Sequence, residues 1–149
     1  MGQILKCAKI LKDIELKNGS FENYLNGFSI PKLIETHDDL KRFWENFELL
    51  QRDLKKRNMP FFAQTTSLLQ LLMDLGFDSI KPDLVVMRVA EKWKIVTKEN
   101  GDKNLRKAVM AMQEYAINRQ FRSLAIDWVV LTFGEQKGAK AVFEGRLKL

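Results

Sequence analysis

Two segments decide the fold of this chain: Met59-Pro60-Phe61-Phe62-Ala63-Gln64-Thr65-Thr66 and Lys81-Pro82-Asp83-Leu84-Val85-Val86-Met87-Arg88. The first predicts a tight turn between two helices. The second predicts another turn, one that places a carboxylate at the start of a third helix. A helix N-terminus favours the ionised form of a carboxylate and fixes its direction. The spacing therefore predicts helices and turns over about residues 50–95, with Asp83 held at a helix start.

The sequence on both sides of these turns carries apolar residues at helical spacing, over 4–14, 40–50, 68–75 and 105–116, and a strong apolar run over 124–133. Thr36 with Asp39 three residues later resembles an acidic capping box. Residues 129–133 taken alone fit a strand, but no partner strand is expected elsewhere, so we interpret 124–133 as a largely buried helix. No repeat or linker divides the chain. The sequence predicts a single compact all-α domain over residues 1–149.

Composition and charge weakly favour a polyanionic partner. The chain has 149 residues, 46% hydrophobic and 30% charged, which is ordinary for one globular domain. Its net charge is +6, and a basic surface attracts nucleic acid. A solvated surface is the alternative explanation for most of these charges. Between residues 100 and 149, five acidic residues accompany nine basic ones: Lys103, Arg106, Lys107, Arg119, Arg122, Lys137, Lys140, Arg146 and Lys148.

Cysteine and histidine usage limits the chemistry. Cys7 and His37 are the only residues of their kinds, too few for a zinc site, an iron–sulfur cluster or an internal disulfide. We therefore predict no metal and no cofactor. No apolar run approaches the roughly 18 residues of a membrane span, and the N-terminal residues contain no signal-peptide core. We expect a cytoplasmic protein with no membrane partner.

The first segment resembles the turn of the helix-hairpin-helix DNA glycosylase superfamily, which usually reads Leu-Pro-Gly-Val-Gly, followed two residues later by Thr-Ala. Residues 59–66 keep the length, the proline and a threonine, while Phe61 and Ala63 replace the two glycines. Backbone N–H groups at such a turn bind a DNA phosphate. For Phe61 we favour core packing over stacking on a base or sugar. The resemblance implies a helix-hairpin-helix motif with DNA-binding residues Pro60, Phe61, Phe62, Ala63, Gln64, Thr65 and Thr66.

The second segment is similar to the same superfamily, in which an aspartate opens a helix and a valine and an arginine follow. The resemblance implies that Asp83 is the catalytic carboxylate, which stabilises positive charge on the sugar or orients water as the N-glycosidic bond breaks. It also implies that Lys81 and Arg88 position the DNA backbone. The alternative is that Asp83 is only a favourable charge at a helix start, with Arg88 as an ion-pair partner.

Within the superfamily, the chain most resembles bacterial 3-methyladenine DNA glycosylase I, through Ala8, Gly19-Ser20-Phe21 and residues 125–134. That family's N-terminal part supplies zinc ligands, an acidic base-reading residue and aromatic pocket walls, and it has no counterpart before Ile4. The aromatic residues available for a base pocket lie at core spacing, so we favour packing for all of them: Tyr24, Trp44, Trp93, Tyr115 and Trp128.

Three functional hypotheses follow. The first is a glycosylase-like protein of base excision repair that binds damaged double-stranded DNA and, if it is an enzyme, cleaves the N-glycosidic bond of alkylated purines such as 3-methyladenine. The second is a non-catalytic helical DNA-binding or interaction module that has lost the base pocket. A protein partner that completes the pocket is a further open alternative. The third is a helical interaction protein with no nucleic-acid role.

Overall fold

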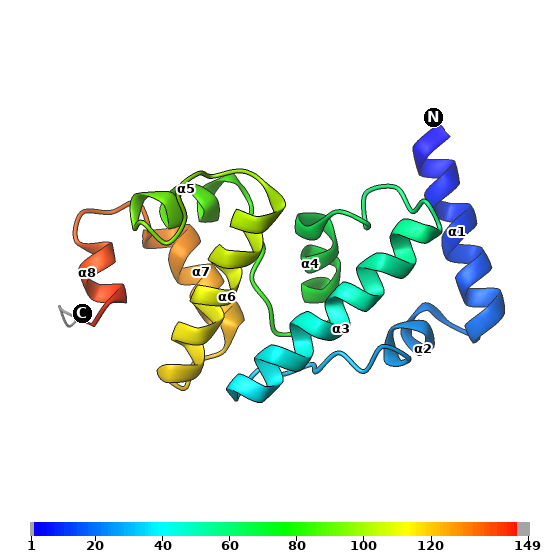
Figure 1. Ribbon diagram of the computed structural model, residues 1–149, viewed down its shortest axis with the longest axis horizontal. Coiled ribbons are helices and arrows are strands. Elements are labelled where there is room, and N and C mark those ends of the chain that lie inside the picture. Colours follow the sequence, from blue (N-terminus) through cyan, green and yellow to red (C-terminus); the bar gives the residue numbers. More distant parts are fainter. Residues whose placement is uncertain (1, 146–149) are drawn as a thin grey trace.

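The computed structural model describes residues 2–145, which form eight helices and no strand (Figure 1). The all-α prediction is confirmed for this part of the chain. The helices are α1 (Gly2–Asn18), α2 (Phe21–Asn26), α3 (His37–Lys56), α4 (Thr65–Asp74), α5 (Leu84–Lys92), α6 (Asp102–Asn118), α7 (Ser123–Phe133) and α8 (Ala139–Phe143).

Local signals set several of the helix ends. At the start of α3, the Thr36 hydroxyl accepts the Asp39 N–H at 3.1 Å and Asp39 Oδ2 accepts the Thr36 N–H at 3.0 Å, so the predicted capping box is confirmed. Gly76 has a φ of 86° just after α4, a conformation that glycine adopts without a steric cost. Asp83 is the N-cap of α5, so the predicted place of this carboxylate at a helix start is confirmed.

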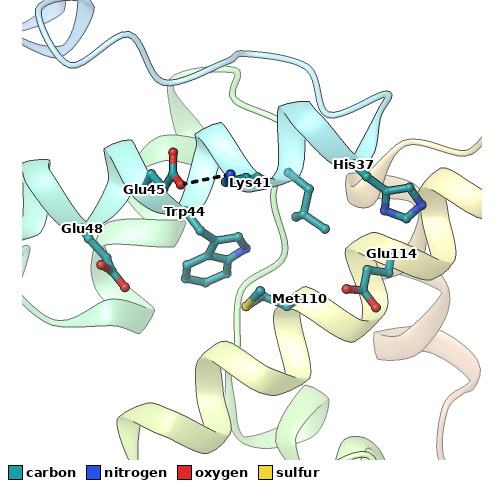
Figure 2. Close-up of a pocket in the computed structure, with 8 residues that line it drawn as sticks. His37, Lys41, Trp44, Glu45, Glu48, Met110 and Glu114 are labelled. Carbon is teal, nitrogen blue, oxygen red and sulfur yellow. Dashed lines mark ion pairs between the residues drawn. The ribbon is translucent and has the colours of Figure 1, made fainter.

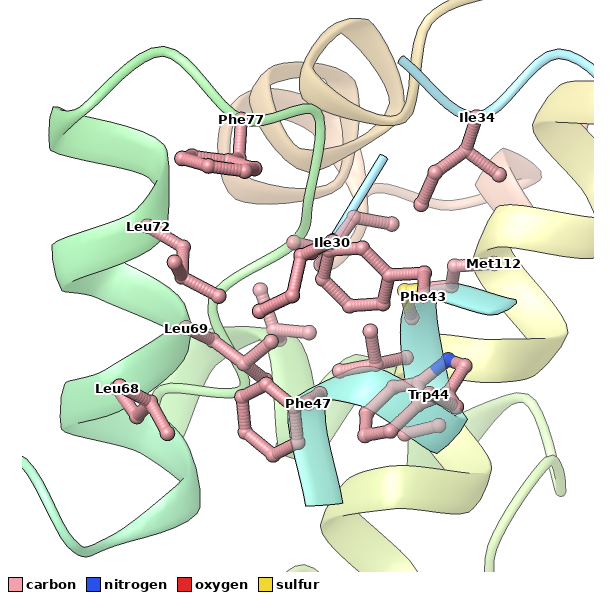
Figure 3. Close-up of a cluster of buried hydrophobic side chains, with 14 of the residues drawn as sticks. Ile30, Ile34, Phe43, Trp44, Phe47, Leu68, Leu69, Leu72, Phe77 and Met112 are labelled. Carbon is pink, nitrogen blue, oxygen red and sulfur yellow. The ribbon is translucent and has the colours of Figure 1, made fainter. Parts of the chain in front are cut away.

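The core forms around α3, whose buried residues recur every three or four positions. Figure 3 shows Phe43 and Phe47 of α3 facing Leu69 and Leu72 of α4, with Met112 of α6 beside them. All five side chains are fully buried. Fully burying a side chain of this size contributes about 1.5–3 kcal/mol, so this cluster fixes α4 against α3 and α6.

The helices are arranged along the long axis of the molecule, with α1 and α8 at opposite ends and α4 between α3 and α6 (Figure 1). Helix α6 packs against α3, α4, α5 and α7, and α5 also packs against α7. The two turns singled out in the sequence lie immediately before α4 and before α5. Their positions therefore depend on how α4 packs against α6 and how α5 packs against α6 and α7.

Helix α7 is less buried than predicted. Ile126, Asp127 and Val130 are buried, whereas Trp128 is 62% exposed and Leu124 is 48% exposed. The reason is that α7 lies at the surface and packs on α5 and α6 with one face only. Among residues 2–145, no helix combines the length and the hydropathy needed to cross a membrane.

Candidate functional site

The turn between α3 and α4 is closed by its own backbone. The Phe62 N–H donates to the Pro60 carbonyl at 2.7 Å, and the Gln64 N–H donates to the Phe61 carbonyl at 2.9 Å. Phe61 has a φ of 60°, a left-handed conformation that costs a non-glycine residue about 1–2 kcal/mol. Its side chain is 47% exposed, so our prediction of core packing for Phe61 is wrong. The tip of the turn projects beyond the core, and Phe62 packs against the core instead.

Buried hydrogen bonds hold the end of this turn. The Gln51 amide donates to the Ala63 carbonyl and to the Thr65 hydroxyl, both at 3.1 Å. The Thr65 hydroxyl donates to Asp102, and Arg106 donates to Gln51 Oε1 at 2.6 Å and to Asp102 Oδ2 at 2.8 Å. Burial acts to raise the pKa of Asp102, but the hydrogen bonds from Thr65 and Arg106 outweigh it and lower that pKa. The Thr65 side chain thus anchors the turn to α3 and α6.

The second turn carries Asp83. Its Oδ1 accepts the Val86 N–H at 3.0 Å, which is the N-cap bond of α5. The Asp83 N–H donates to the Lys81 carbonyl at 2.8 Å. The Thr66 hydroxyl, at the start of α4, donates to the Pro82 carbonyl at 3.4 Å. The chain after α4 therefore returns along that helix, and the structure brings residues of the first predicted segment next to the aspartate turn of the second.

Asp127 of α7 also holds this turn, although we did not predict it as a site residue. Its Oδ1 accepts the Lys81 N–H at 3.0 Å, and the residue is only 6% exposed. Burial, and to a lesser extent the charge of Asp83, raises the pKa of Asp127 to about 6. A signal was present in the sequence, because Asp127 is the only charged residue between positions 124 and 133. A lone carboxylate in an apolar helix needs a specific partner.

Lys81 and Arg88, predicted to contact DNA, and the basic residues of the last third of the chain differ in how far other groups of the protein already hold their side chains. Arg88 is exposed and lies 3.7 Å from a Glu99 carboxylate oxygen, as the ion-pair alternative expected. Lys81 is half-buried. Arg106 is committed to Asp102, Glu48 and Gln51 within the protein. Arg122 lies 3.5 Å from the buried Asp78. Arg146 and Lys148 lie outside the described residues.

Two open hollows lie on α3, away from Asp83. One, of about 330 Å³, lies between α3 and α6, with Trp44 and Met110 between His37 and Glu114 on one side and Glu48 on the other (Figure 2). The second, of about 500 Å³, lies at the start of α3 beside Asp38. Neither hollow is lined by Asp83 or by residues 59–66. Among the described residues, no three histidine, cysteine or carboxylate side chains gather as a metal site requires.

The aromatic residues considered as pocket walls divide into two groups. Tyr24, Trp44 and Trp93 are buried, so the packing prediction is confirmed for them. Tyr115 is half-buried. For Trp128 the packing prediction is wrong, because this side chain lies on the outer face of α7 and contacts Phe133 edge-on at a centroid distance of 6.0 Å. Among the exposed aromatic side chains of the described residues are Phe61, in the turn between α3 and α4, and Trp128, directly after Asp127.

Comparisons with protein-family models, with curated proteins and with solved structures give no match for this chain.

Proposed function

We propose that this chain is a DNA-binding protein of the helix-hairpin-helix glycosylase type, in which residues 59–66 form the hairpin and Asp83 is the catalytic carboxylate. The observation that carries the proposal is the contact between the two turns, where the Thr66 hydroxyl reaches the Pro82 carbonyl beside Asp83. A phosphate held at the hairpin and a nucleotide facing Asp83 would then belong to one stretch of DNA, as a glycosylase requires.

The backbone of Phe61 supports the hairpin assignment. Phe61 takes the place of the first glycine in the turn that this segment resembles, and it adopts a left-handed φ of 60°. Glycine is the usual residue in that conformation. The side chain of Gln64 does not cap α4, so the first N–H groups of α4 are left for another acceptor. Such groups form a phosphate site in a DNA-binding hairpin.

Asp83 has the chemistry that the proposed reaction needs. One carboxylate oxygen, Oδ1, holds the Val86 N–H, which fixes the direction of the group. No described residue donates to Oδ2, which leaves it for a substrate. In the proposed reaction, the bond between the sugar and the alkylated base breaks, positive charge grows on the sugar, and water completes the hydrolysis. A fixed carboxylate stabilises that charge without reorganising.

Asp83→Asn tests the catalytic role. Asparagine still caps a helix, so the fold is retained while the charge is lost. We expect release of 3-methyladenine from duplex DNA to fall at least about 100-fold, the scale of losing one electrostatic contact to a transition state. Binding to a duplex carrying a stable abasic-site analogue should change little.

The matched control for that experiment is Asp38→Asn, which removes the same charge from an exposed residue in the first turn of α3. It should leave excision unchanged. Equal excision by wild-type protein and Asp83→Asn would remove Asp83 from the mechanism, whatever the DNA affinity.

The second candidate is a non-catalytic DNA-binding module, favoured by the position of both hollows away from Asp83. It predicts DNA binding that weakens steeply with salt, because the contacts are to phosphates, but no excision of any lesion. Binding to abasic and undamaged duplexes at 50 and 200 mM salt (about a fourfold range, enough to show the slope) separates the candidates. Preference for the abasic duplex favours the glycosylase-type site, and equal affinity favours the module.

A further inference from the structure

Asp127 is unusual because its charge serves no evident packing purpose. The residue is buried in an apolar helix, where an ionised carboxylate carries a desolvation cost. Among the described residues, its hydrogen-bond partner is a single backbone group, the Lys81 N–H at 3.0 Å. An asparagine oxygen would accept the same hydrogen bond without that cost. The structure therefore raises the question of what the carboxylate does beyond accepting this bond.

The hydrogen bond from Lys81 to Asp127 lies at the start of the turn that carries Asp83. Lys81 begins the turn that ends at Asp83, and the Asp83 N–H donates back to the Lys81 carbonyl at 2.8 Å. The peptide unit before Lys81 is thus held by α7, and the carbonyl after it by Asp83. Thr66 holds Pro82 from α4. A displacement of Asp127 moves the start of this turn, and with it the carboxylate of Asp83.

We propose that Asp127 is the positioning residue of the Asp83 turn, fixing Asp83 through the Lys81 N–H and adjusting the charge beside it by gaining or losing a proton. The assignment of this turn to DNA recognition rests on the proposed function above. The coupling between the two aspartates is a property of the free protein and is testable without DNA.

The charged groups that act on Asp127 come from this same turn. Lys81 favours the ionised form and Asp83 opposes it. At the first turn of α7, Asp78 accepts the Ser123 and Leu124 N–H groups and faces Arg122. Burial is the largest influence and raises the pKa of Asp127 to about 6. Above this pH the site holds a second negative charge, which disfavours a polyanion; below it, the charge beside Asp83 is removed.

The direct test follows the amide of Lys81 by nuclear magnetic resonance between pH 4 and 8 in the full chain, about two pH units either side of the expected midpoint. We expect this amide to shift with a midpoint near pH 6, because it donates to the titrating group. Asp127→Asn should remove the inflection while keeping the hydrogen bond. Asp83→Asn should move the midpoint to lower pH, and the control Asp38→Asn should leave it in place. An absent inflection in the wild type, or a midpoint that Asp83→Asn leaves unchanged, would overturn the proposal.

DNA binding supplies the second readout. In the wild-type protein, affinity for the abasic duplex should fall as pH rises through about 6 more steeply than in Asp127→Asn, whose site gains no charge. Asp127→Ala removes the acceptor and should lose the preference for the abasic duplex, which Asp127→Asn keeps. Identical preference and identical pH profiles in all three proteins would overturn the positioning role at the DNA site.

The two experiments separate the two proposals. If the wild-type protein binds no DNA at any pH while the Lys81 amide titrates as expected, the proposed function fails and the coupling of Asp127 to Asp83 stands. If DNA is bound with a preference for the abasic duplex but the Lys81 amide shows no inflection, the proposed function stands and the positioning role fails.

Discussion

At the scale of single residues, Phe61 shows how a turn can hold a non-glycine residue in a conformation that favours glycine. Its φ of 60° lies in a region that glycine occupies freely and that a β-carbon makes costly. The surrounding bonds, from Gln51 to Ala63 and to Thr65, hold the turn regardless of this strain. Strain of this kind persists where the rest of the structure determines the conformation.

Phe61→Gly should therefore stabilise the protein. Removing the left-handed strain gains about 1–2 kcal/mol, part of which is offset by the loss of the half-exposed ring, so we expect a net gain of about 1 kcal/mol. Urea unfolding followed by circular dichroism measures it. Ala63→Gly is the control at the other glycine position of the pattern, where φ is not positive, and it should destabilise by about 0.5–1 kcal/mol. A lower unfolding midpoint for Phe61→Gly would contradict this account of the turn.

At the scale of one element, α7 has apolar residues that are buried and apolar residues that are exposed, and the sequence alone does not distinguish them. Val130 is 0% exposed, whereas Leu131, the next residue, is 41% exposed. A helix that is apolar all round is usually buried, so the sequence predicts that 124–133 is largely buried. In the structure its inner face meets α5 and α6, and its outer face carries Leu124, Trp128 and Leu131.

A pair of substitutions on α7 measures this difference. Val130→Ala should cost at least about 1 kcal/mol, because it leaves a cavity between α7 and its neighbours. Leu131→Gln should change the unfolding free energy by no more than about 0.5 kcal/mol, as is usual for a surface position. Equal costs in urea unfolding would mean that the outer face of α7 is covered.

At the scale of the whole molecule, Asp127 links overall stability to pH. Its pKa is about 6 in the folded protein against an ordinary value of 3.8, so between these values the folded state binds the proton more strongly than the unfolded chain. The stability that this carboxyl group contributes is therefore fully present below pH 3.8 and is lost as the pH rises through about 6. The difference between the two pKa values corresponds to about 2–3 kcal/mol.

Asp127→Asn should therefore stabilise the protein at pH 8 by about 2 kcal/mol relative to wild type, and by much less near pH 3.5, where both side chains are neutral. Urea unfolding of both proteins at the two pH values gives the comparison. The same difference at both values would show that the Asp127 charge carries no cost in the fold.

Much of the local structure is determined by the sequence itself, because it depends on residues close together in the chain. Helical spacing, the Thr36–Asp39 capping box and the place of Asp83 at the start of α5 were all predicted and are present. Each relies on contacts within one turn of helix or on the conformational range of one residue.

Only the tertiary structure decided which of these local features meet. The contact of Thr66 with Pro82 and the bond from Lys81 to Asp127 join segments that are distant in the sequence. The exposure of Phe61 and Trp128 depends in the same way on which distant segments cover these side chains. The apolar run 124–133 predicts a largely buried helix, but it does not show which side of that helix a neighbour covers. Asp127 illustrates the same limit, since its raised pKa and its partner arise from burial against a turn more than forty residues earlier in the chain.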